Sequence, residues 1–120
     1  MTPIWSREAI ADLVALRAYI AQDDPKAAQR VALHIIHSVE TLLPNNPEMG
    51  RPGRVPGTRE LVIAGTPFIV PYRVVGNTIQ ILRIYHSARQ WSETFEGSRW
   101  VKHGKPQIGA LYGTRTRLAR

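Results

Sequence analysis

The sequence predicts one α+β domain: an N-terminal strand and an antiparallel helical hairpin packed on a three- to four-stranded, mainly antiparallel sheet. Three observations predict it. Two stretches with helical periodicity fill the first 44 residues, a connection rich in proline and glycine covers residues 44–57, and runs rich in Val, Ile and Tyr follow it. A chain of 120 residues that is 43% hydrophobic is long enough to close one core.

The N-terminal segment predicts a short strand and then a helix. Thr2–Trp5 is the strand candidate, and the hydroxyl of Ser6 suits a helix N-cap. Apolar residues recur at helical spacing from residue 10 to residue 21, which forms one apolar stripe. Arg17 is the only charged member of this stripe. We expect its stem to lie along the core and its guanidinium to reach water.

A second helix is predicted from the Asp23-Asp24-Pro25 sequence onwards. Aspartate caps helices, and proline is pre-set for the first helical position, so this tripeptide ends one helix and begins the next. The apolar period then continues to Leu43. Because proline cannot continue a helix, we expect the second helix to stop at Pro44.

Three strands are predicted after the connection, over residues 59–64, 68–75 and 78–85, and Gly76-Asn77 supplies a two-residue hairpin turn. This turn sets a register that pairs Val74 with Ile79, Tyr72 with Ile81, Val70 with Arg83, and Phe68 with Tyr85. We expect that face to cover the helices. The opposite face would carry Ile69, Pro71, Arg73, Gln80, Leu82, Ile84 and His86 and would be partly open. Pro71 cannot donate a ladder hydrogen bond, which places it beside a bulge or an edge.

Charge and composition indicate which kind of partner the protein binds and exclude some kinds of catalytic and metal site. Residues 1–44 carry four basic and five acidic side chains, whereas residues 45–120 carry twelve basic and four acidic ones, within a net charge of +7. Such asymmetry favours an acidic partner, either a nucleic acid or an acidic peptide. The chain has no cysteine, so thiol nucleophiles and Cys-based zinc sites are excluded. Without a membrane-spanning run or a secretion signal, we expect a cytoplasmic protein that does not bind membranes.

Five short segments of the chain, taken together and in this order, resemble the RelE/ParE toxin superfamily. They are WSREAIADLVALRAY (5–19), PEMGRPGR (47–54), GTRELV (57–62), PFIVPYRV (67–74) and ILRIYHSARQW (81–91). The resemblance implies a toxin domain over residues 1–92. Residues 93–120 are then a C-terminal extension, either partly disordered or introduced by cloning.

The superfamily contains two activities. RelE-like and YoeB-like members cut mRNA on the ribosome, whereas ParE-like members poison DNA gyrase without catalysis of their own. Cleavage of RNA needs a base, an acid and cations. If this chain is a nuclease, the resemblance implies that His86, Arg83, Arg73 and Glu60 carry the catalysis. If it is a binding toxin, Arg59, Arg83, His86, Arg89 and Trp91 are the residues that would contact the target.

Two positions favour the gyrase-directed branch. His86 matches the catalytic histidine of YoeB-like toxins, but Ser87 stands where those toxins have an aromatic acid. The arginine that nuclease members carry early in the middle strand falls on Ile69, and an isoleucine cannot neutralise a phosphate. We therefore expect a toxin that acts by binding and that oligomerises only with its antitoxin.

The partners implied are a cognate antitoxin protein and, as target, DNA gyrase or the ribosome with its mRNA. A ribosome-dependent endoribonuclease is the first alternative, because an active site that is bound to the ribosome can use cations supplied by its surroundings. A non-toxic, basic nucleic-acid-binding module is the second alternative, favoured only by charge. We expect no cofactor and no metal, since His34 and His37 lack a third ligand nearby in the sequence.

Overall fold

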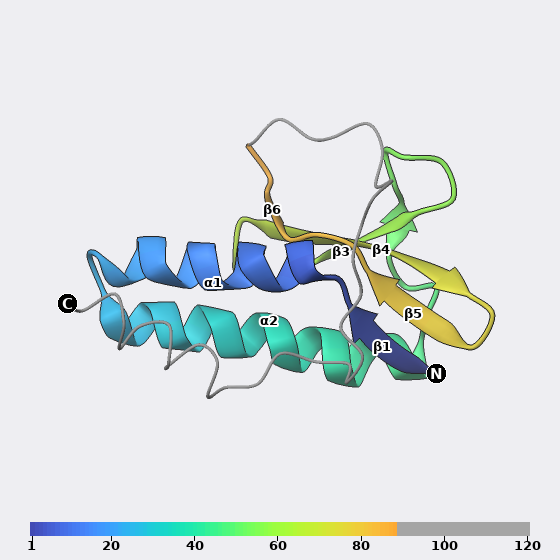
Figure 1. Cartoon of the computed structure of the whole chain (residues 1–120), viewed down its shortest axis with the longest axis horizontal. Helices are drawn as coiled ribbons and strands as arrows, with labels where there is room; N and C mark the ends of the chain where they lie inside the picture. Colours follow the sequence, from blue (N-terminus) through green and yellow to red (C-terminus); the bar gives the residue numbers. More distant parts are fainter. Residues whose placement is uncertain (89–120) are drawn as a thin grey trace.

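The computed structural model describes residues 1–88, which form two helices and a six-stranded sheet (Figure 1). The elements are β1 (Thr2–Trp5), α1 (Arg7–Ala21), α2 (Pro25–Asn45), β2 (Arg51–Pro52), β3 (Arg59–Val62), β4 (Phe68–Val75), β5 (Thr78–Ile81) and β6 (Tyr85–His86). The strand order is β1-β5-β4-β3-β2, and β6 pairs with β4. Only β1 and β5 run parallel. The predicted α+β fold class is confirmed, with more strands than expected.

The helical hairpin begins as its capping residues predict. The hydroxyl of Ser6 accepts a hydrogen bond from the Ala9 amide at 2.9 Å, and the Asp24 carboxylate accepts one from the Ala27 amide at 3.0 Å. The buried residues of both helices then pack against one face of the sheet. Arg17 corrects one expectation, because its side chain is only 5% exposed. Its guanidinium therefore lies within the protein, and the prediction that it reaches water is wrong.

The end of α2 corrects a second expectation. The helix runs past Pro44 to Asn45. A proline this close to a helix end removes only one backbone hydrogen bond, and nearby side chains bond the carbonyls of the last turns. Thr41 Oγ1 donates to the His37 carbonyl at 2.7 Å, and Asn45 Nδ2 donates to the Thr41 carbonyl at 3.0 Å.

The β4–β5 hairpin has the predicted register, but the pairing shifts by one residue beyond it. Tyr72 pairs with Ile81 and Val74 with Ile79, as the turn requires. Residues 82–84 then leave the strand, and β6 resumes with Phe68 opposite His86 and Ile69 opposite Tyr85. The predicted pairing of Phe68 with Tyr85 is therefore wrong, and so is that of Val70 with Arg83. The third strand ends at Ile81, and β3 ends at Val62.

Pro71 lies beside this break in pairing, as its missing amide hydrogen predicts. Its carbonyl accepts a hydrogen bond from the Leu82 amide at 3.0 Å, so Pro71 faces residues 82–84. In an antiparallel pair the N–H and C=O of one residue point to the same neighbour. The missing N–H of Pro71 would therefore point towards residues 82–84, where β5 has already ended, and no strand pairing is lost there. The sequence predicted a bulge or an edge here, and the structure has a break between β5 and β6.

The shift exchanges the faces of the last predicted strand. We call the side of the sheet that packs on the helices the helix face; its core includes Val70, Tyr72, Ile81 and Ile84. The opposite side is the outer face, and it carries Glu60, Val62, Ile69, Pro71, Arg73, Gln80, Leu82 and Tyr85. Ile84 and His86 were expected on the outer face and Tyr85 on the helix face; all three are reversed.

The outer face is more closed than its mixed composition suggests. Ile69, Leu82 and Tyr85 are all buried, and Val55 from the connection packs on Leu82 and Tyr85. The connection therefore folds back over part of this face. Within residues 1–88, neither helix combines the length and the apolar composition that crossing a bilayer requires.

Candidate functional site

The four residues that the nuclease hypothesis requires are distributed over both faces of the sheet. Glu60 pairs with Pro71, and Arg73 pairs with Gln80, which places both on the outer face. His86 pairs with Phe68, whose ring packs on the helix-face core. Because successive side chains on a strand point to opposite faces, the sheet separates His86 from Glu60 and Arg73.

His86 is a half-buried side chain with two contacts. Its ring meets that of Phe68 edge-on, with centroids 5.6 Å apart and an interplanar angle of 85°. The Ala88 amide donates a hydrogen bond to His86 Nδ1 at 3.1 Å. These two contacts hold the ring in place at the end of β6.

Arg83 is bound to α1, so not all of its guanidinium donors are available to solvent or to a partner. Its Nε and Nη2 donate to the two carboxylate oxygens of Asp12 at 2.7 and 3.0 Å. The same carboxylate accepts from the Ile84 amide at 3.0 Å. The hydrogen bond to Asp12 raises the pKa of Arg83, and the guanidinium carbon lies 5.1 Å from the centre of the Tyr85 ring. Asp12 therefore fixes the irregular segment 82–84 against the helix.

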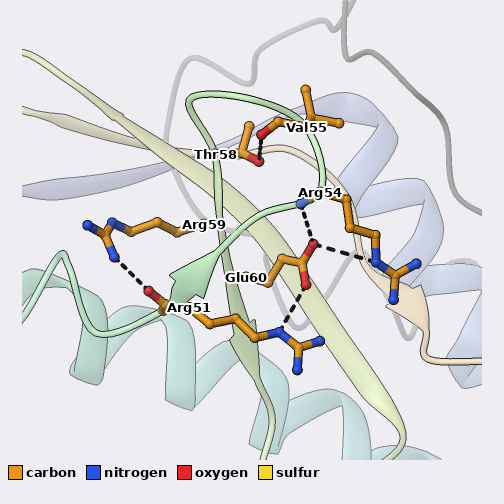
Figure 2. Close-up of polar contacts among 7 residues, drawn as sticks. Arg51, Arg54, Val55, Thr58, Arg59 and Glu60 are labelled. Atoms are coloured by element: carbon orange, nitrogen blue, oxygen red, sulfur yellow. Dashed lines mark hydrogen bonds and ion pairs between the residues drawn. The ribbon is translucent and has the colours of Figure 1, made fainter.

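Glu60 lies between Arg51 and Arg54, two arginines of the connection (Figure 2). The residue is 3% exposed, and its carboxylate accepts hydrogen bonds from Arg51 Nε at 3.1 Å and from the Arg54 amide at 2.9 Å. Arg54 Nε also lies 3.8 Å from the carboxylate, which makes a second ion pair. The carboxylate thus binds two guanidinium groups and one turn of the connection at once.

Arg59 and Arg73 also bond within the protein. Arg59 Nη1 donates to the carbonyls of Glu48 and Gly50, at 3.1 and 2.8 Å, so it fastens the connection to β3. Arg59 and Glu60 point to opposite sides of the strand, as predicted. Arg73 Nε donates to Gln80 Oε1 at 2.7 Å across the hairpin. Arg89 and Trp91 lie outside the described residues.

A groove with a volume of about 960 Å³ runs between α1, the β3–β4 turn and the β6 segment. Asp12, Arg83 and His86 line it together with apolar and aromatic side chains, among them Leu16, Tyr19, Ile20, Val31, Phe68, Ile84 and Tyr85. Tyr19 is 73% exposed. The groove is therefore largely apolar, with an ion pair and a histidine at its side.

The partners of the candidate residues could not be predicted from the sequence. Asp12, which holds Arg83, lies 71 positions away from it in the chain. Arg51 and Arg54 belong to the PEMGRPGR phrase that carried the family resemblance, and their flanking glycines gave a usable signal of a tight turn. Tyr19 had no signal beyond its place one residue before Ile20 of the apolar stripe.

Comparisons with known proteins identify the family. Residues 4–91 match the family described as the ParE toxin of the type II toxin–antitoxin system parDE. The chain is 43% identical over 89 residues to a protein of Sinorhizobium fredii named as toxin Y4kP, covering 74% of this chain and 91% of the relative. It is 41% identical over 86 residues to toxin RelE2 of Caulobacter vibrioides, covering 72% of this chain and 94% of the relative.

A solved structure agrees with this assignment. A chain of the chromosomal ParDE toxin–antitoxin system from P. aeruginosa superimposes with a TM-score of 0.61 and 37% sequence identity, over 72% of this chain and 95% of that one. The strand, helical hairpin and sheet described above are therefore those of a known toxin fold. The chain belongs to the ParE toxin family of type II toxin–antitoxin systems, within the RelE/ParE superfamily.

Proposed function

We propose that this toxin inhibits growth by binding DNA gyrase in the cytosol and that it carries out no catalysis of its own. The separation of His86 from Glu60 and Arg73 by the sheet is the observation that carries the proposal. Cleavage of RNA needs proton-transfer groups and cations around one scissile phosphate. Among residues 1–88, Arg83 near His86 is engaged by Asp12, and Ile69, 4% exposed, occupies the position of the nuclease arginine, so neither position offers a cation for the phosphate.

The antitoxin that the family implies is proposed to place an amphipathic segment in the groove beside α1. Leu16, Ile20 and Phe68 offer apolar contacts, and Tyr19, 73% exposed, adds a large aromatic side chain that a partner could cover. An amphipathic helix laid in an apolar groove is a recurrent mode of peptide recognition. The solved relative from P. aeruginosa is titled as a ParDE system, in which toxin and antitoxin occur together.

The target is tested with purified gyrase and in growing cells. If gyrase is the target, saturating toxin alters supercoiling or DNA cleavage by gyrase in vitro, and induction without antitoxin causes filamentation and DNA-damage signalling. Unchanged gyrase reactions at saturating toxin would remove the proposal. Adding the antitoxin before the toxin is the matched control, since it should abolish the effect.

A ribosome-dependent endoribonuclease is the second candidate, favoured by the 41% identity to toxin RelE2 and by His86 at the end of β6. Its signature is rapid arrest of translation with new mRNA 5′ ends, mapped by primer extension soon after induction. Such ends, together with intact gyrase function, would replace the gyrase proposal with this one.

A further inference from the structure

The groove beside α1 contains an arginine whose charge is already neutralised. Among residues 1–88, the carboxylate and guanidinium groups that line this groove are those of Asp12 and Arg83. Both remain partly accessible, since 19% of the Asp12 side chain and 30% of the Arg83 side chain are exposed. The pKa of Arg83 is raised first by its hydrogen bond to Asp12 and to a smaller extent by Glu8. The groove therefore does not present a net positive charge to a partner.

Arg83 nevertheless keeps hydrogen-bond donors that Asp12 does not use. A guanidinium has five N–H donors, and Asp12 takes one from Nε and one from Nη2, so 5 − 2 = 3 donors have no acceptor among residues 1–88. One of these on Nη1 and one on Nη2 lie parallel, along the edge next to the one that binds Asp12. The two bonds to Asp12, together with the Tyr85 ring 5.1 Å from the guanidinium carbon, hold this free edge in a fixed orientation.

A segment that covers the groove must supply an acceptor to this free edge, because buried donors without a partner destabilise a complex. Main-chain carbonyls inside an amphipathic helix are already bonded within the helix, so the acceptor has to be a side chain. A carboxylate would bring a second negative charge beside Asp12 and would lose its hydration, which is costly in an apolar groove. A carboxamide oxygen has two lone pairs for the two parallel donors and carries no charge.

We propose that Asp12 and Arg83 together select a neutral carboxamide, the side chain of Asn or Gln, on the antitoxin segment that occupies the groove. The inference rests on the proposed seat of the antitoxin beside α1. Arg83 donates the hydrogen bonds, and Asp12 determines the specificity because it cancels the charge that would otherwise favour an acid. Although the basic composition of the chain favours an acidic partner, this groove discriminates against an acidic side chain at the position opposite Arg83.

The experiment titrates the full chain, with its arginines ¹⁵N-labelled, with hydrocinnamide and with hydrocinnamate, which share one apolar body and differ in the carboxamide and the carboxylate. A pH of about 8 lies above the range in which histidines normally take up a proton. Both probes are expected to shift the Arg83 Nε–H signal in a saturable way, and the amide should bind about fivefold more tightly. In Asp12→Asn the uncompensated guanidinium should reverse this preference. Asp23→Asn removes the same charge at an exposed position outside the groove lining and should leave the preference unchanged.

Three results would overturn the proposal: no saturable shift at Arg83, binding of the acid to the wild type as tight as that of the amide, or an unchanged preference in a folded Asp12→Asn variant. If a thermal melt shows that Asp12→Asn does not fold, the comparison of the two probes on the wild type decides alone. Probes that bind in the groove without preferring the amide overturn this inference and leave the antitoxin seat intact. An antitoxin that binds without shifting the Arg83 signal would instead remove the seat, and with it the occupant proposed for the groove.

Discussion

Asp12 and Glu60 show how single carboxylates determine what the arginines of this toxin can do. Asp12 accepts hydrogen bonds from Arg83 Nε and Nη2, one edge of the guanidinium, and from the Ile84 amide. Glu60 binds Arg51 and the Arg54 turn. In each case the carboxylate fixes an irregular piece of backbone, which regular strand hydrogen bonds cannot do. An arginine that is held in this way contributes first to the fold, and only its remaining donors reach a partner.

His86→Gln separates the two functional candidates at the level of one residue. Glutamine keeps a comparable size and an acceptor for the Ala88 amide, but it cannot act as a general acid or base. A nuclease that depends on His86 should lose about 10²- to 10⁴-fold in cleavage. We expect growth inhibition to be nearly unchanged, measured as colony formation after induction at equal protein level. Loss of toxicity in a variant with an unchanged melting temperature would contradict the binding mechanism.

The sequence predicted where charged residues sit on strands better than what they contact. Strand alternation correctly put Arg59 and Glu60 on opposite faces, because that follows from the period of two. Their partners come from the connection, at Gly50, Arg51 and Arg54. That contact depends on how a segment without periodicity folds back on the sheet, and no local pattern specifies it.

At the scale of elements, the helices and the first hairpin were predictable and the end of the sheet was not. Caps, apolar stripes and the Gly76-Asn77 turn are local signals, and each led to the right element. The register after Ile81 depends on Pro71 and on the bonds that Asp12 makes across the fold. A break of one residue reverses every later side chain, which explains why Ile84, Tyr85 and His86 were assigned to the wrong faces together.

Tyr72→Phe tests how the connection is tied to the sheet. The Tyr72 hydroxyl accepts from the Gly50 amide at 2.9 Å and donates to the Pro47 carbonyl at 2.7 Å. Gly50 permits this contact, since a Cβ there would lie 2.7 Å from the same hydroxyl. Removing the hydroxyl leaves both backbone groups without that partner, which should cost about 1–3 kcal/mol of stability in chemical denaturation.

The stability difference between the wild type and Tyr72→Phe should also depend on pH in the alkaline range. Burial raises the pKa of Tyr72 above its ordinary value, so the native state resists ionisation more than the unfolded chain does. The stability that this difference supplies is complete below the unfolded pKa of about 10 and is lost as pH rises through the raised folded value. The advantage of the wild type over Tyr72→Phe should therefore shrink above pH of about 10. An advantage that stays constant or grows there would show that Tyr72 does not ionise as inferred.

Over the whole molecule, the positive charge is concentrated outside the described domain. Residues 1–88 carry nine basic and seven acidic side chains, whereas residues 89–120 carry seven basic and two acidic ones. The net charge of +7 thus divides into +2 and +5. From the sequence alone, the basic character was expected in everything after residue 44, which includes the sheet. We therefore expect recognition by the domain itself to rely on particular arginines and on apolar contacts more than on overall attraction.

A chain ending at residue 92 should separate these two contributions. Every residue of the main core cluster lies between Trp5 and Ile84, and the family match ends at residue 91, so we expect the melting midpoint to stay within a few degrees. The deletion removes six basic and two acidic residues. Non-specific binding to a short DNA duplex should weaken at low salt, and each lost phosphate contact should reduce the salt slope by about 0.9.

Gyrase inhibition and binding to the antitoxin should persist in the shortened chain, because both are proposed to use the folded domain. An unfolded truncated chain would show that residues 93–120 complete the domain, and a folded chain without toxicity would assign target recognition to the extension.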